Sequence, residues 1–357
     1  MASSNPFLSL APELIQTIGD ELSMSDLKQL RLTCKQLQPL VNHQLFRTVM
    51  IDITINNIKK SVDMLQLLAT GDCNTRGSRA DLEAQSATEQ VAGCLRDALR
   101  SFSSLTTIRW SPVQWDNEEV QIAVVEALVG LSTLKNLHLN TTNCKAALPV
   151  DKLKGLEEIS IFGLCSYVET MDNVGRLIAR SPGLRSLKVA QYRNYGKPLG
   201  KAQSLHQLLE YCDPLEPLRL RHLSVQEALV RLDHITLPHL RSLTSLELTS
   251  VCDPFNTGNR YSYYRSQDDT GAAFDAQKVG SSTEDIWKAF ASTGVRLEKL
   301  KHDSLPRSLL KYLSSYSGLK SLNIAPTHFD SAGLSDAAAT EFFFCPSEQS
   351  CSYPGNS

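Results

Sequence analysis

Histidines and cysteines are the residues of this chain best suited to metal binding or catalysis, and it holds 8 and 9 of them. None of the histidines pairs with a cysteine or a second histidine at the spacing of a metal site. His234 and His239 flank Pro238, but the sequence offers no third ligand nearby. Asp233 and His234 could belong to a hydrolytic triad, yet sequence neighbours are not thereby oriented for proton transfer. We therefore expect no metal, no cofactor and no catalytic residue, and a hydrolase is only a remote alternative.

Polar residues interleaved with regularly spaced leucines are better candidates for a binding surface. In LKNLHLN (134–140), for example, Lys135 and His138 alternate with leucines. The net charge of the chain is −2 and these residues carry both signs, which favours a protein partner over nucleic acid. The alternative is an ordinary solvated surface. The candidates for substrate binding are Arg109, Lys135, His138, Glu158, Arg185, Lys188, His222 and Glu247.

A repeated L-x-x-L-x-L pattern carries these polar residues. It begins at Leu105, Leu134, Leu156, Leu184, Leu220, Leu243, Leu297 and Leu319, and FRTVMI (46–51) is a possible first member. Most repeats begin 22 to 36 residues apart, and one interval is 54 residues. A strand that points alternate side chains inward explains L-x-L, and helical patterns such as NEEVQIAVVEALVG fill the intervals. We predict an α/β fold over 48–341, a curved solenoid with parallel strands inside and helices outside.

Three segments depart from this rhythm. Residues 70–85 and 251–282 are polar and glycine-containing, and we predict that both are exposed loops. Residues 342–357 fit no repeat, and we predict an irregular tail. The phenylalanines at 342–344 have no further repeat to pack against, which favours a truncated chain or a mistaken gene boundary.

The first 47 residues carry three helical patterns instead: PELIQTIGDEL (12–22), SDLKQLRLTCKQL (25–37) and QPLVNHQLFRTV (38–49). In the second, Leu27, Leu30, Cys34 and Leu37 fall on one face, with Ser25 as the expected N-cap. Three short helices bury little apolar surface by themselves. Either another protein or the rest of this chain must therefore cover that face.

Residues 8–47 resemble an F-box in the order and spacing of their motif. The matching residues are Leu10, Pro12, Glu13, Leu14, Ile18, Leu22, Asp26, Leu27, Leu30, Arg31, Cys34, Lys35, Leu40, Leu45 and Phe46. The segment departs from the family pattern at Ala11, where proline is usual, and at Leu37, where tryptophan is common. The later repeats resemble the leucine-rich repeats that often follow an F-box, particularly in fungal families.

This resemblance implies a non-enzymatic substrate-recognition adaptor of a Skp–cullin–F-box ubiquitin ligase. Its N-terminal helices would bind the Skp adaptor, and through it a cullin–RING ligase, while the repeats hold a substrate protein. The expected adaptor contacts, or their direct support, are Pro12, Leu14, Ile18, Leu22, Leu27, Leu30, Cys34 and Leu37. The alternative is a leucine-rich-repeat scaffold whose N-terminal helices only cap the solenoid.

The cysteines and the hydropathy pattern bear on location. The cysteines are scattered without a CxxC motif, as is usual in a reducing compartment. The first residues lack the basic and apolar regions of a secretory signal. No stretch approaches the roughly 18 apolar residues of a membrane span. We therefore expect a protein of the cytosol or the nucleus.

Overall fold

The computed structural model describes residues 10–33, 37–51, 93, 95–100, 102, 104–112, 118–142, 144, 147–164, 168–191, 204–226, 230–249 and 282–324. The loop predicted at 70–85, nearly all of that at 251–282, and the tail at 342–357 lie outside these residues. So does Cys34.

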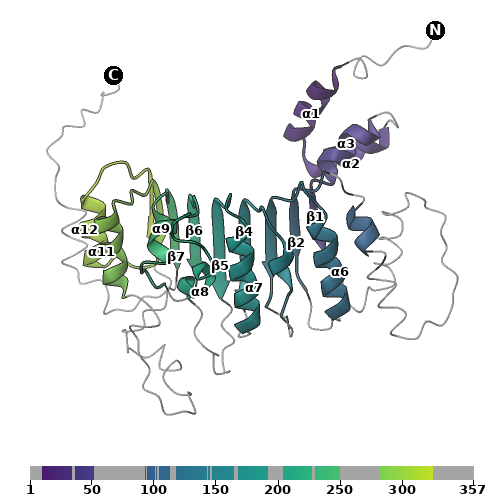
Figure 1. Cartoon of the computed structure of the whole chain (residues 1–357). Helices are drawn as coiled ribbons and strands as arrows, with labels where there is room; N and C mark the ends of the chain where they lie inside the picture. The colour runs from purple at the N-terminus through teal and green to yellow at the C-terminus, as the bar shows by residue number, and fades with distance from the viewer. Residues whose placement is uncertain are drawn as a thin grey trace, which may run out of the picture.

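An all-parallel sheet forms the body of the described chain. Its nine described strands follow one another in sequence order, each paired with the next (Figure 1). They are β1 (Thr48–Ile51), β2 (Thr107–Trp110), β3 (Asn136–Asn140), β4 (Glu158–Leu164), β5 (Ser186–Gln191), β6 (His222–Gln226), β7 (Ser245–Thr249), β8 (Lys299–His302) and β9 (Ser321–Ile324). The prediction of an α/β fold with parallel strands is confirmed, and FRTVMI supplies the first strand.

The L-x-L pairs of the repeats lie side by side because every strand pairs in the same register. One row across the sheet consists of Ile108, Leu137, Ile159, Leu187, Leu223, Leu246, Leu300 and Leu322. From β2 to β8 this row is buried, as is the row two residues further along each strand. Local alternation within each strand thus builds a continuous apolar face.

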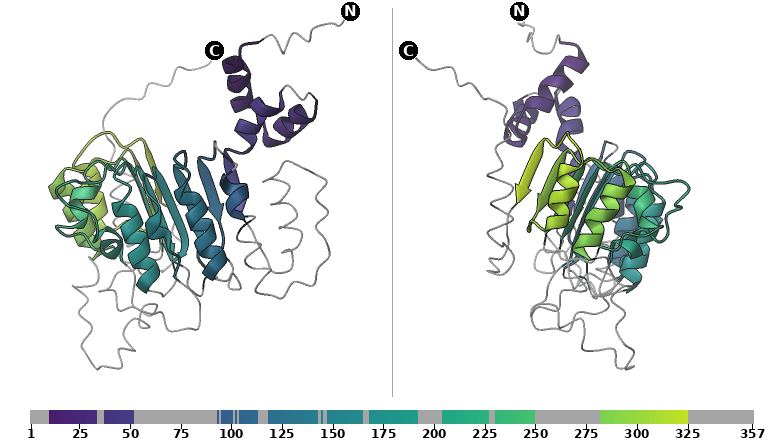
Figure 2. Two further views of the ribbon diagram at one scale, coloured as in Figure 1. Left: turned by 45° about the vertical axis from the view of Figure 1, so that its right-hand side comes forward. Right: turned by 90° about the vertical axis from the view of Figure 1, so that its left-hand side faces the viewer.

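Helices cover that apolar face. They are α6 (Glu118–Val129), α7 (Val168–Ala179), α8 (Leu205–Leu209), α9 (Thr236–Leu240), α11 (Thr283–Thr293) and α12 (Arg307–Ser314), with a 3-10 turn at Val150–Lys152. They lie along one side of the sheet (Figures 1 and 2). A parallel pair needs a crossover connection, and these helices provide it. A single apolar core between helices and sheet runs from Leu95 to Tyr312.

The first three helices form a separate small unit beyond the β1 end of the sheet (Figure 2). These are α1 (Pro12–Glu21), α2 (Met24–Thr33) and α3 (Gln38–Leu45). Their own core contains Ile15, Leu27, Leu37, Val41 and Leu45.

Phe46 joins this helical unit to the sheet body. Its ring packs against both apolar cores and stacks on Phe102 at a centroid distance of 5.2 Å. Arg31 also lies over the Phe46 ring, with its guanidinium carbon 5.7 Å from the ring centroid. The next residue, Arg47, approaches Asp20 of α1 at 3.7 Å before β1 begins.

Candidate functional site

The residues expected to contact an adaptor separate into a buried and an exposed group. Leu27 and Leu37 are only 5% and 3% exposed and pack inside the helical unit. Leu22 and Leu30 are half-buried against the same core. Pro12 is the first residue of α1, and Cys34 lies outside the described residues. The apolar face of α2 that the sequence singles out is therefore covered largely by this chain itself.

Leu14 and Ile18 of α1, by contrast, face away from that core. They are 52% and 38% exposed and lie one turn apart on the same side of the helix. The core takes Ile15 from α1, so this helix has more apolar residues than its inner face can bury. We call Leu14 and Ile18 the exposed α1 pair.

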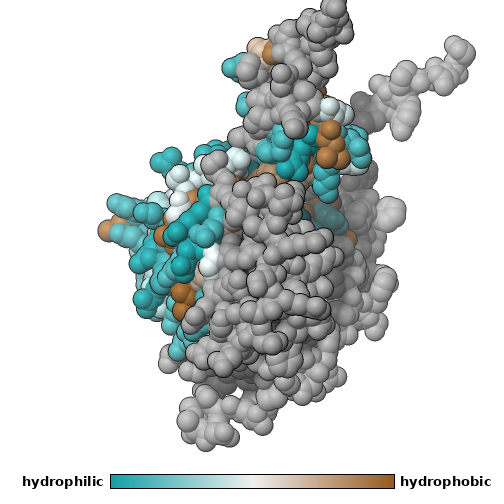
Figure 3. All heavy atoms as spheres, turned by 90° about the vertical axis from the view of Figure 1, so that its right-hand side faces the viewer, coloured by the Kyte–Doolittle hydropathy of each residue, from teal (hydrophilic) through white to brown (hydrophobic). Residues whose placement is uncertain are grey.

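Two further apolar side chains of the helical unit are exposed and were not among the expected contacts. Leu32 is 78% exposed, and Met24 at the start of α2 is also exposed. Leu32 is not three or four residues from Leu27 or Leu30, so it lies off their face of the helix. This spacing is the sequence signal that could have identified Leu32 as exposed. Apolar surface is visible on the unit at the top of Figure 3. Exposed apolar side chains are typical of an interaction site where they form one contiguous patch.

Six of the eight expected substrate-binding residues lie on the polar face of the sheet, opposite the helices. Arg109, His138, Lys188 and Glu247 share one row across the strands. Glu158 and His222 share the neighbouring row. Lys135 and Arg185 come one residue before β3 and β5, respectively. Phe162 of β4 is exposed in line with Glu158, although it was not among the expected binding residues.

Glutamates of this face form ion pairs with lysines. Lys188 Nζ lies 2.8 Å from Glu158 Oε1 and Lys135 Nζ lies 3.4 Å from Glu157 Oε1, while Lys301 pairs with Glu247. Such exposed pairs contribute at most about 1 kcal/mol each to stability. Their effect is on charge, since they neutralise the carboxylates.

His138 lies within this group of charges. Burial lowers its pKa, Glu158 opposes that shift, and Arg109 and Lys188 add to it. The imidazole is therefore neutral at pH 7, so it contributes hydrogen-bonding capacity to the face but no charge.

Asp233 binds a different histidine from the one the sequence suggested. Its Oδ2 atom lies 2.7 Å from His206 Nδ1 and 3.0 Å from Arg231 Nε, while His234 is exposed. Oδ1 accepts hydrogen bonds from the backbone of Ile235 and Thr236. Burial would raise the pKa of Asp233, but these hydrogen bonds and the electrostatic effect of His206 and Arg231 lower it overall. The carboxylate thus organises the turn before α9.

Within the described residues, no group of three histidine, cysteine or acidic side chains could hold a metal ion. Cys144 is buried. No helix in the described part of the chain is long and apolar enough to cross a membrane.

Two buried histidines serve the fold. His239 Nδ1 accepts a hydrogen bond of 3.0 Å from the backbone of Leu218. His302 occupies a leucine position of β8, and its Nδ1 accepts from Ser304 N at 2.9 Å. Burial is the main cause that lowers the pKa of each, while Asp213 opposes the shift at His239 and Asp303 opposes it at His302.

We expect the free energy of unfolding to fall as the pH decreases below 6.5, the unperturbed histidine pKa. Because both pKa values are lower in the folded chain, the unfolded chain takes up the protons first. The stabilisation is present above that pH and is lost as the pH falls through the folded values. Urea unfolding at a series of pH values measures this. His302→Leu restores the leucine pattern and should flatten the dependence, whereas His234→Asn should not. A wild-type midpoint that does not change with pH would contradict this account.

Comparison with known proteins gives no family. No protein-family model matches the chain, and no curated protein matches it. The functional argument therefore depends on the residues and surfaces described above.

Proposed function

We propose that this chain is a substrate-recognition adaptor of a Skp–cullin–F-box ubiquitin ligase. In this proposal the N-terminal helices are an F-box that binds the Skp adaptor. The sheet and its helices are a leucine-rich-repeat solenoid that holds a substrate protein. The chain itself performs no chemistry and raises the local concentration of substrate beside a ligase that other subunits supply. The proposal places it in the cytosol or the nucleus.

The observation that carries the proposal is the exposed α1 pair, Leu14 and Ile18. Burying a leucine or isoleucine side chain gains about 1.5–3 kcal/mol, so leaving both in water forgoes that gain. A partner groove that accepts α1 would recover it, in the manner of helix-in-groove recognition. In this arrangement Leu27 and Leu37 act as support, because they hold α2 and α3 behind the binding helix.

The repeat body supports the second half of the proposal. Its strands follow the chain order and stay in one register, as expected of stacked repeats in which each unit contacts only its neighbours. Helices take one side of the sheet, which leaves the polar rows of the other side open to a partner.

The alternative is a repeat scaffold whose N-terminal helices only cap the solenoid. The contact of Phe46 with both apolar cores favours it, because a capping unit must pack against the first repeat. However, capping does not use Leu14 and Ile18, which remain exposed when Phe46 is in place.

Titration calorimetry of the full chain with purified Skp adaptor tests the proposal. We expect a saturable one-to-one complex with a dissociation constant in the micromolar range or below. A micromolar dissociation constant corresponds to a binding free energy of about −8 kcal/mol. Circular dichroism first establishes that the chain is folded. If a folded chain gives no saturable binding, the scaffold becomes the better interpretation.

A further inference from the structure

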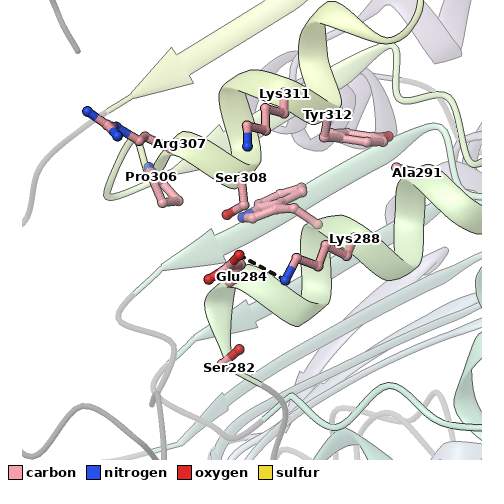
Figure 4. Close-up of a pocket in the computed structure, with 10 residues that line it drawn as sticks. Ser282, Glu284, Lys288, Ala291, Pro306, Arg307, Ser308, Lys311 and Tyr312 are labelled. Atoms are coloured by element: carbon pink, nitrogen blue, oxygen red, sulfur yellow. Dashed lines mark ion pairs between the residues drawn. The ribbon is translucent and has the colours of Figure 1, made fainter.

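A groove with a volume of about 560 Å³ lies between α11 and α12, on the helical side of the molecule (Figure 4). This volume is in the range of small-molecule sites. Its lining residues are Ser282, Glu284, Trp287, Lys288, Ala291, Pro306, Arg307, Ser308, Lys311 and Tyr312. Neither the adaptor surface nor the polar face of the sheet includes any of them.

Positive charge dominates this lining. Among the described residues that line the groove, Glu284 is the only acidic one, and its Oε1 lies 2.8 Å from Lys288 Nζ. Arg307 and Lys311 lie one turn apart on α12, and neither forms an ion pair with another described residue. In Figure 4, Lys311 and Ser308 lie opposite Glu284 and Lys288 across the groove. Within the described part of the chain, the charges of these two side chains therefore remain uncompensated.

The amino end of α12 adds to the positive potential. The N-cap residue is Pro306, which offers no side-chain acceptor, and the first turn contains no acidic residue. The first backbone N–H groups of a helix carry partial positive charge and need acceptors. Arg307 at the first helical position increases this potential.

Trp287 provides an independent indication that a ligand belongs here. It lines the groove and is fully buried, yet its indole Nε1–H has no hydrogen-bond partner among the described residues. Its ring stacks on Tyr312 at 5.5 Å, and the Tyr312 hydroxyl already donates to Val295 O at 2.9 Å. Buried donors are nearly always paired, so an unpaired one calls for an acceptor.

We propose that this groove binds a small organic anion. A phosphate or carboxylate group sits at the amino end of α12, where Arg307 and Lys311 pair with it. The apolar part of the ligand lies against Ala291 and Pro306, next to the buried indole. A ligand oxygen supplies the acceptor that Trp287 Nε1 lacks, directly or through the hydroxyl of Ser308. The proposal does not depend on the F-box assignment.

Titration calorimetry on the full chain with phenyl phosphate, benzoate and inorganic phosphate tests this site. We expect saturable one-to-one binding of phenyl phosphate or benzoate, and the tighter of the two identifies the oxyanion. Inorganic phosphate should bind at least about tenfold more weakly, because it lacks the apolar part.

Variants separate a binding site from a chance groove. Arg307→Gln with Lys311→Gln should weaken binding by at least about tenfold, and Trp287→Phe by about threefold to tenfold. Lys299→Gln, which removes an exposed lysine of β8 outside the groove, should leave the affinity unchanged. If Trp287→Phe fails to fold, the double variant alone decides.

Either of two results would overturn the proposal. One is the absence of saturation with both organic probes at about 10 mM, because the dissociation constant would then be too high for a specific site. The other is an affinity that is the same in the wild type and in the double variant.

Discussion

We expect that a chain carrying Leu14→Asp and Ile18→Asp does not bind the Skp adaptor. Each substitution places a carboxylate in a contact from which water is excluded, at a cost of several kcal/mol. A micromolar complex has only about 8 kcal/mol of binding free energy, so two such charges abolish it. Because both side chains are exposed in the free chain, the substitutions should leave its free energy of unfolding within about 0.5 kcal/mol of the wild type.

Titration calorimetry measures the loss, and urea unfolding measures stability in the same samples. Leu215→Asp is the matched control, since Leu215 is 89% exposed in the loop before β6 and should keep wild-type affinity. Leu27→Asp is a poor substitute, because it places a charge inside the helical core and unfolds the unit. Undiminished binding by the Leu14→Asp/Ile18→Asp chain would remove α1 from the interface.

Phe46→Ala weakens the connection between the helical unit and the sheet. Deleting a buried phenylalanine side chain costs about 3–5 kcal/mol, and Phe46 is half-buried, so we expect a loss of about 2 kcal/mol in the free energy of unfolding. The stacking on Phe102 and the contact with Arg31 are lost together. Affinity for the adaptor should change less than about threefold, because the exposed α1 pair is untouched.

Phe162→Ala is the control for this experiment. Phe162 is an exposed phenylalanine of β4, so its removal should change stability by less than about 0.5 kcal/mol. Equal urea midpoints for Phe46→Ala and Phe162→Ala would show that Phe46 does not join the two parts. A Phe46→Ala chain that folds but loses the adaptor would show that binding depends on the junction at Phe46 and not on the exposed α1 pair alone.

The sequence predicted the sheet well because its signal is local and repeated. A strand of four or five residues needs only alternation, and L-x-L supplies it at each repeat. Even FRTVMI, the least regular member, forms β1 in register with β2. His302 stands where the other repeats have an apolar residue, and the structure buries it at that position beside Trp287.

The surface of the helical unit could not be predicted in the same way. The patterns of 12–22 and 25–37 both contain apolar residues three and four apart, so each helix had a plausible inner face. Which residues remain outside depends on the angles between three helices, and Leu14 and Leu32 are the result. Boundaries shifted as well: α2 begins at Met24, and the Ser23 hydroxyl, rather than that of Ser25, accepts from Asp26 N.

Contacts between distant parts of the chain could not be predicted from the sequence either. Asp233 approaches His206, which belongs to the preceding repeat, rather than its neighbour His234. Glutamates counted as part of a mixed surface are paired with lysines of adjacent strands. Neither arrangement has a local sequence signal, because only the stacking of repeats brings these residues together.

Hydrogen exchange of the full chain with and without the Skp adaptor tests the central claim most directly. If the exposed α1 pair is the binding surface, the amides of α1 become protected when the adaptor binds. The amides of β5 and β6 in the centre of the sheet should exchange as before. Protection confined to the sheet body, or no change in α1 under saturating adaptor, would contradict the account.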